Sequence, residues 1–183
     1  MVVPEATPRP RVDQDRRWSI ADVLSASRLP MAVAFLLVPD TRWRFAILAA
    51  AAGTDLLDGH IARRIGSSRL GAFLDPVADK LFMACAFGVV AFSGRLEPFE
   101  IVGVLIRDLV ATIAFAITSF SGRPSSIPAR IGGKAVTVGQ CLTLAAFLLD
   151  SPYLRPMAWA TAAVGLYAIW DYQHVAAKER RRI

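Results

Sequence analysis

Four aspartates in one short stretch are the residues whose type and spacing most clearly point to chemistry. Asp55 and Asp58 are three residues apart, and Asp75 and Asp79 are four apart. Residues at either spacing share one face of a helix, so two neighbouring helices would bring four carboxylates together. Ionised carboxylates at the edge of apolar helices are costly and repel one another. We therefore predict that divalent cations lie among them, and Mg²⁺ or Mn²⁺ suits such oxygen ligands.

Small and cationic residues surround these aspartates. Gly59, Ala62 and Gly71 lack bulky side chains, so a helix or a ligand can approach the backbone closely. Arg63 offers a planar fork of donors to phosphate oxygens, and Ser68 offers a hydroxyl. Paired aspartates at helix ends are more often surface residues or helix caps, but four of them with this glycine spacing favour a site for a pyrophosphate ester.

The elements that would position these residues are apolar helices. The chain has 183 residues, 55% of them apolar, and a mean hydropathy of +0.45, against about 45–50% apolar residues in soluble domains. Helices that cross a bilayer need about 20 residues. A soluble helical bundle is the alternative, but it would need more polar surface. We predict an all-α integral membrane protein with six transmembrane helices, in apolar blocks at about 24–39, 43–62, 72–93, 99–121, 135–150 and 155–172.

The ends of the chain differ from this core. Residues 1–15 are rich in proline and mixed charge, which predicts a disordered tail. The start has no apolar segment typical of a signal peptide. Residues 16–24 mix charged and apolar groups, which is typical of an amphipathic helix in the membrane interface. The domain is expected over 16–172, followed by a basic tail at 173–183.

The basic residues predict an orientation. Fourteen Lys and Arg residues fall in the two tails and in the second-to-third and fourth-to-fifth connections, whereas only four fall in the opposite loops. Basic residues concentrate on the cytoplasmic side, so we predict cytoplasmic termini and a cytoplasmic active site in the cell membrane. The net charge of +6 then favours contact with anionic lipid head groups rather than with nucleic acid.

The stretch from Asp55 to Asp79 resembles the signature of the CDP-alcohol phosphatidyltransferase family. In order it has D, two residues, DG, two residues, AR, seven residues, G, three residues, D, three residues and D. The resemblance, which extends over about residues 16–172, implies transfer of a phosphatidyl group from CDP-diacylglycerol to an alcohol. It also implies two divalent metal ions and, as is common in the family, a homodimer.

The resemblance assigns roles to residues by position. The first three aspartates would ligate the metals, and Asp79 would be both a ligand and the general base. Family members often carry an N-x-x-T pair near the nucleotide, which here reads Asp22-Val23-Leu24-Ser25, so the contact of Asp22 departs from the pattern. The expected contacts of the CDP part are Asp22, Ser25, Asp58, Gly59, Ala62, Arg63, Ser68 and Gly71.

The acceptor alcohol is less specified. Gly133, Lys134, Thr137 and Gln140 resemble a stretch of phosphatidylglycerophosphate synthases. Glycerol 3-phosphate would need cations, and the candidates are Arg107, Arg130 and Lys134. The last two could equally be anchors on the cytoplasmic side, and Arg107 could be structural. The alternatives are phosphatidylinositol phosphate synthase, cardiolipin synthase, or a membrane scaffold or channel with a cation site and no turnover.

Overall fold

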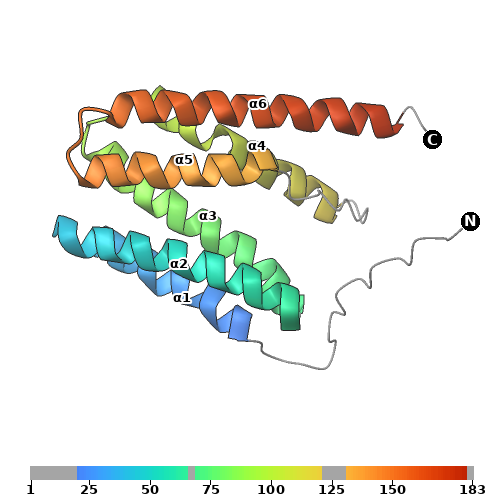
Figure 1. The fold of residues 1–183 in the computed structure, drawn as a ribbon, viewed down its shortest axis with the longest axis horizontal. Helices are drawn as coiled ribbons and strands as arrows, with labels where there is room; N and C mark the ends of the chain where they lie inside the picture. Colours follow the sequence, from blue (N-terminus) through green and yellow to red (C-terminus); the bar gives the residue numbers. More distant parts are fainter. Residues whose placement is uncertain (1–19, 66–68, 121–130, 181–183) are drawn as a thin grey trace, which may run out of the picture. The chain divides into compact units, whose positions relative to one another are not determined.

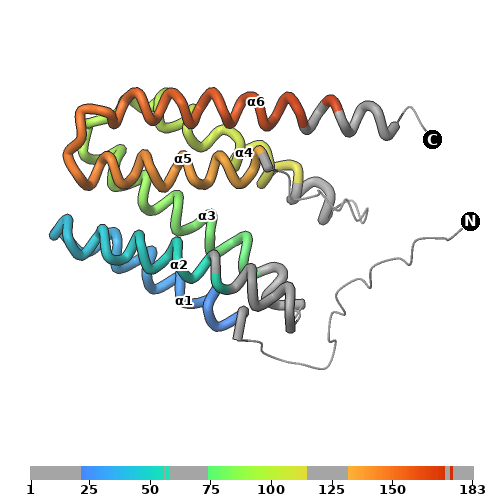
Figure 2. Tube along the Cα trace, in the orientation of Figure 1, coloured from blue at the N-terminus to red at the C-terminus, as the bar shows by residue number. Residues whose placement is uncertain are grey.

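The computed structural model describes residues 20–65, 69–120 and 131–180 (Figures 1 and 2). Within these ranges some side chains also lie outside the description, namely those of residues 20, 21, 56, 58–65, 69–73, 115–120, 131, 172, 173 and 175–180. The described part is all-helical, as predicted. Its six helices are α1 (Ile20–Leu37), α2 (Thr41–Ile65), α3 (Arg69–Phe92), α4 (Pro98–Phe120), α5 (Ile131–Leu148) and α6 (Leu154–Arg180).

The chain divides into two compact units, residues 1–85 and residues 86–183, and α3 runs from one into the other. In the first unit α1 packs on α2. Asp40 caps α2, because its Oδ1 accepts from the backbone N–H groups of Arg42 at 2.7 Å and Trp43 at 3.4 Å. Phe35 of α1 meets Phe82 of α3 edge-on, with ring centroids 5.8 Å apart. These contacts join three helices around one core.

In the second unit α4 and α5 both pack on α6. Close approach of α5 and α6 depends on Gly139, where an added Cβ would lie 2.7 Å from Thr161 Oγ1. One turn further along α5, the hydroxyl oxygens of Thr143 and Thr161 lie 3.2 Å apart. Small residues and hydroxyl pairs are typical of helix contacts in membranes. The backbones of these helices therefore meet without large side chains between them.

Two connections of the second unit are tied together. Arg95, between α3 and α4, donates to Phe147 O at 3.1 Å and pairs with Asp150 at 2.7 Å. Asp150 has φ of 55° and Gly94 has φ of 68°, and both residue types tolerate the left-handed region. This contact links the α3–α4 turn to the α5–α6 turn.

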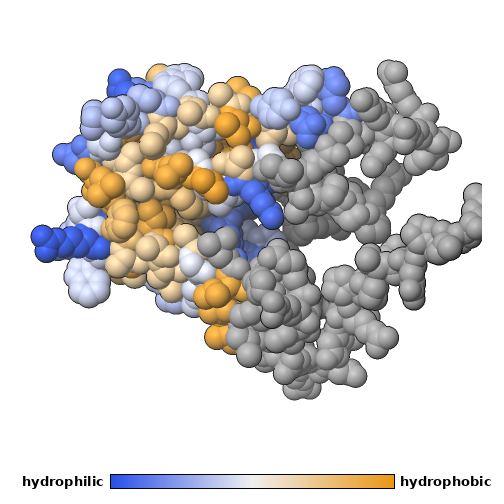
Figure 3. All heavy atoms as spheres, viewed as in Figure 1, coloured by the Kyte–Doolittle hydropathy of each residue, from blue (hydrophilic) through white to orange (hydrophobic). Residues whose placement is uncertain are grey.

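Many large apolar side chains of the described residues face outwards. Phe92 is 94% exposed, and Leu37, Trp43 and Tyr153 are also largely exposed. Figure 3 shows hydrophobic residues over much of the described surface on that face. Soluble monomers seldom expose large contiguous apolar patches. Among the described residues one helical stretch, Leu74–Ser93, is long and apolar enough by itself to cross a bilayer, and Gly132–Leu148 is a shorter apolar helix.

Each predicted apolar block falls on one helix, but some bounds differ. Residues 20–24, expected in a separate interfacial helix, continue into the first apolar block as α1, whereas residues 16–19 lie outside the described ranges. The helix α6 continues through Arg180, beyond the block predicted to end at residue 172. Ala, Lys, Glu and Arg in that segment are strong helix formers, so the helix outlasts the apolar pattern.

Candidate metal and active site

The buried face of α1 begins with three polar residues at helical spacing. Asp22, Ser25 and Arg28 follow one another at intervals of three, and all three are buried. Ala32 and Phe35 continue the same face as ordinary apolar core. The amino-terminal half of α1 therefore directs polar groups towards α2 and α3, where a core helix would direct apolar ones.

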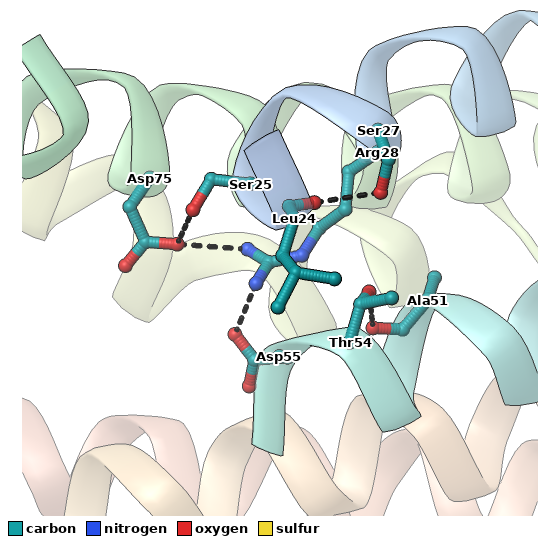
Figure 4. Close-up of polar contacts among 8 residues, drawn as sticks. All are labelled: Leu24, Ser25, Ser27, Arg28, Ala51, Thr54, Asp55 and Asp75. Atoms are coloured by element: carbon teal, nitrogen blue, oxygen red, sulfur yellow. Dashed lines mark hydrogen bonds and ion pairs between the residues drawn. The ribbon is translucent and has the colours of Figure 1, made fainter. Parts of the chain in front are cut away.

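Arg28 joins two of the predicted metal ligands. Its Nη2 lies 3.2 Å from Asp55 Oδ1 on α2, and its Nη1 lies 3.0 Å from Asp75 Oδ1 on α3 (Figure 4). The arginine side chain is 1% exposed, whereas the two aspartates are 43% and 49% exposed. Aspartates twenty residues apart in sequence thus lie at one guanidinium group.

Ser25 contacts the same carboxylate. Its Oγ donates to Asp75 Oδ1 at 3.1 Å, so that one oxygen atom accepts from both Ser25 and Arg28 (Figure 4). Charge-assisted hydrogen bonds of this kind are stronger than neutral ones. The contacts from α1 fix Asp75 through one oxygen and leave almost half of the side chain exposed.

The donor set suits a hard divalent cation. Asp55 and Asp75 supply carboxylate oxygens from two helices, and both side chains reach the surface. Among the described side chains no group of three or more His, Cys, Asp or Glu residues is close enough to hold a metal. The side chain of Asp58 is not among them, and Asp79 lies half-buried on α3, one turn after Asp75.

The second unit holds a polar cluster that includes an acceptor candidate. Arg107 Nη1 pairs with Asp108 Oδ1 at 2.8 Å, and Gln140 donates to Asp108 Oδ2 at 2.6 Å. Gln140 also donates to Val104 O at 3.1 Å and is itself buried. An added Cβ on Gly133 would lie 2.5 Å from Arg107 Nη2. The guanidinium of Arg107 therefore lies over the first turn of α5.

Comparison with known proteins decides the family. Residues 18–170 match the family model described as CDP-alcohol phosphatidyltransferase. The chain belongs to the CDP-alcohol phosphatidyltransferase family. It is therefore a transferase of phospholipid biosynthesis and a membrane protein, and the family implies CDP-diacylglycerol and an alcohol as its substrates. The resemblance noted from the Asp55–Asp79 stretch is confirmed.

Its relatives differ in their named activities. A Mycobacterium tuberculosis protein named "Putative cardiolipin synthase" is 32% identical over 89% of this chain and 83% of its own. "Probable phosphatidylglycerophosphate synthase" of the same species is 33% identical over 82% and 75%. The Escherichia coli CDP-diacylglycerol–glycerol-3-phosphate 3-phosphatidyltransferase is 31% identical over 84% and 87%. The chain is similar to all three.

The structure places some predicted site residues of this phosphatidyltransferase and omits others. Asp22 and Ser25 are buried on α1, Asp55 and Asp75 meet at Arg28, and Lys134 is exposed in the first turn of α5. The backbone, without the side chain, is described for Asp58, Gly59, Ala62, Arg63 and Gly71. Ser68 and Arg130 lie outside the described residues.

Arg28 is the residue that sequence reasoning missed. In the sequence it is a single charge inside the apolar block at 24–39. Its signal was positional, because it follows Ser25 by three residues and Asp22 by six and so shares their helix face. A buried arginine needs carboxylate partners, and Asp55 and Asp75 supply them.

Proposed function

We propose that this phosphatidyltransferase moves the phosphatidyl group of CDP-diacylglycerol to glycerol 3-phosphate, giving phosphatidylglycerophosphate and CMP. Asp55, Asp58, Asp75 and Asp79 would hold two divalent ions, Mg²⁺ or Mn²⁺. The observation that carries the metal assignment is the meeting of Asp55 and Asp75, from α2 and α3, at one buried guanidinium. Two half-exposed carboxylates held side by side are what a shared cation would need.

The reaction breaks one phosphorus–oxygen bond and makes another. Bound divalent ions would neutralise the pyrophosphate and the leaving CMP. Asp79 would take the proton of the acceptor hydroxyl while that oxygen attacks the phosphorus attached to the lipid. Nucleotide contacts would come from the buried pair Asp22 and Ser25 and from the segment after Asp55. In that segment the proposed contacts are Asp58, Gly59, Ala62, Arg63, Ser68 and Gly71.

The acceptor assignment is supported by the cations of the second unit. Asp108 and Gln140 hold Arg107 against the first turn of α5, where Lys134 is exposed. Backbone N–H groups at a helix start also favour anions. An arginine fork together with an exposed lysine suits the phosphate of glycerol 3-phosphate, and Arg130 would add a third cation. The similarity to the E. coli glycerol-3-phosphate enzyme points the same way.

Cardiolipin synthesis is the second candidate, because a relative with that name is 32% identical to the chain. Its acceptor would be phosphatidylglycerol, a lipid with one negative charge on its phosphate. Inositol phosphate would give a third product of the same chemistry. Transfer to any of the three acceptors releases CMP from CDP-diacylglycerol, so the rate of CMP release allows their use to be compared directly.

The deciding experiment is an acceptor panel with purified protein and radiolabelled CDP-diacylglycerol. Glycerol 3-phosphate should support the fastest CMP release, and the lipid product should be phosphatidylglycerophosphate. Faster release with phosphatidylglycerol or with inositol phosphate would move the assignment to the corresponding synthase. If no acceptor in the panel supports CMP release, a scaffold or channel with a cation site would be favoured.

The membrane arrangement is part of the proposal. Six helices, each carrying one apolar block, would cross the bilayer, with both termini and the aspartates on the cytoplasmic side. The distribution of Lys and Arg supports this orientation, and a nucleotide product is released where nucleotides are used. A homodimer, common in the family, remains part of the expectation.

A further inference from the structure

Arg28 and Asp22 are the most deeply buried charged residues among the described residues of the first unit. The side chain of Arg28 is 1% exposed, and its contacts with Asp55 and Asp75 connect α1 to both aspartate-bearing helices. Burying a guanidinium is costly unless carboxylates and good geometry compensate it. An apolar residue would fill this helix position at lower cost. Packing alone therefore does not explain why an arginine occupies this position.

The geometry of the contacts supplies that reason. Arg28 uses two different nitrogens, and each meets the Oδ1 atom of a different aspartate (Figure 4). A carboxylate has about four lone-pair sites on its two oxygens. Each carboxylate can therefore accept from the guanidinium through one oxygen and bind a cation through its exposed part. The rigid fork of arginine spans the two carboxylates, whereas a lysine ammonium is a single point of charge.

We propose that Arg28 is a positioning residue that fixes the orientations of Asp55 and Asp75 for divalent-metal binding, with Ser25 supporting Asp75. The proposal rests on the metal-dependent function above. Without Arg28 the two carboxylates would repel each other and turn away, so the metal would have to order them on binding. Partners of metal-ligating side chains typically contribute about 10–100-fold in metal affinity.

The test is Mn²⁺ binding by the purified full-length protein in detergent, followed by the electron paramagnetic resonance signal of free Mn²⁺. Arg28→Gln should bind Mn²⁺ about 10–100-fold more weakly than the wild type. Arg28→Lys should fall between them, because it keeps the charge but cannot span both aspartates. Ser25→Ala removes one hydrogen bond to Asp75, whose donor is an uncharged hydroxyl, and should give a smaller loss than Arg28→Gln.

Arg44→Gln is the matched control. Arg44 lies in the same unit and donates through Nε to Phe35 O at 3.1 Å. Among the described side chains it does not contact Asp55 or Asp75. Its substitution removes the same charge and should leave Mn²⁺ affinity unchanged. Thermal unfolding in EDTA identifies the variants that remain folded. If Arg28→Gln does not fold, Arg28→Lys decides.

The outcomes separate this inference from the proposed function. A wild-type protein that binds no Mn²⁺ contradicts the metal site itself. If the wild type binds Mn²⁺ and Asp55→Asn does not, the metal site stands. Folded Arg28 variants that then bind Mn²⁺ as tightly as the wild type, or more tightly, would overturn the positioning role. Tighter binding would mean that the arginine competes with the metal.

Discussion

At the scale of single residues, the candidate site of this phosphatidyltransferase pairs carboxylates with one buried guanidinium cation. Asp55 and Asp75 face Arg28, and Ser25 adds a hydrogen bond to Asp75. If repulsion between the carboxylates were the only effect, removing them would stabilise the folded protein. Because Arg28 is buried against them, their removal would instead leave a buried cation with fewer compensating charges.

Removal of the proposed metal ions or of one proposed ligand should stop turnover. Asp75→Asn should lower CMP release by orders of magnitude, and EDTA should do the same reversibly, because charge on the leaving CMP would no longer be stabilised. Asp40→Asn is the matched control, since Asp40 caps α2 and asparagine caps a helix equally well. Full activity in EDTA, or in two of the four Asp→Asn variants of the motif, would remove the metal hypothesis.

Removal of both aspartates that contact Arg28 should lower stability. Asp55→Asn with Asp75→Asn should reduce the thermal unfolding temperature in EDTA more than either substitution alone. The loss should stay below the about 3–5 kcal/mol typical of a fully buried pair, because the carboxylates are half-exposed. Adding Arg28→Met to the double variant should restore the unfolding temperature. No recovery with methionine would show that the buried charge is not the cause.

Spacing within the sequence was sufficient to identify the four aspartates as candidate site residues, but it was insufficient to identify Arg28. Asp55, Asp58, Asp75 and Asp79 form a local pattern that a helical period reveals. Arg28 lies on another helix, and its pairing depends on how α1 packs, which no local pattern contains. Its shared face with Asp22 and Ser25 was the one available sign.

At the scale of elements, each apolar block predicted a helix, and the errors lie at the ends. The helix α5 begins at Ile131, before the apolar block at 135–150, so Gly133 and Lys134 extend the helix and lie in its first turn. The helix α6 runs through Arg180. Hydropathy marks where a helix is apolar, whereas helix propensity and capping determine where it ends. Arg107 pairs with one carboxylate oxygen of its neighbour Asp108, and Gln140 of α5 donates to the other oxygen. Adjacency in sequence does not require this arrangement, which depends on the contact between α4 and α5.

Gly133→Ala tests the contact between α4 and α5. The added Cβ would lie 2.5 Å from Arg107 Nη2, so the flexible end of the arginine should move while the helices stay in place. Loss of one charge-assisted contact of about 1.5–3 kcal/mol corresponds to roughly a 10- to 150-fold rise in KM for glycerol 3-phosphate. The KM for CDP-diacylglycerol should change little.

Gly88→Ala provides the control for this substitution. Gly88 lies within α3, and an added Cβ there meets nothing within 4 Å. Alanine in a helix interior is more favourable than glycine by about 0.5–1 kcal/mol, so kinetics should match the wild type. An unchanged acceptor KM in Gly133→Ala would separate Arg107 from acceptor binding, and equal changes in both KM values would indicate a general distortion.

At the scale of the whole molecule, composition predicted an all-helical membrane protein, and the fold and family agree. The pattern of apolar blocks along the sequence could not predict which helices pack together. The contact of Gly139 with Thr161 joins residues far apart in sequence through a close fit of shapes, and that of Arg95 with Asp150 does so through an ion pair. The orientation in the bilayer depends instead on charge in the loops, which the sequence contains directly.

Site-directed labelling tests that orientation. In a chain with Cys85 and Cys141 replaced by serine, single cysteines are placed at Glu5, Tyr153 and Arg181. The excess of basic residues in the tails predicts that a membrane-impermeant maleimide reaches Glu5→Cys and Arg181→Cys only after permeabilisation. Tyr153 lies in the α5–α6 connection and is 65% exposed, so Tyr153→Cys should react in intact cells. Opposite accessibility of the two ends would rule out an even number of spans, and reaction of both ends in intact cells would reverse the orientation and place the aspartates away from the cytoplasm.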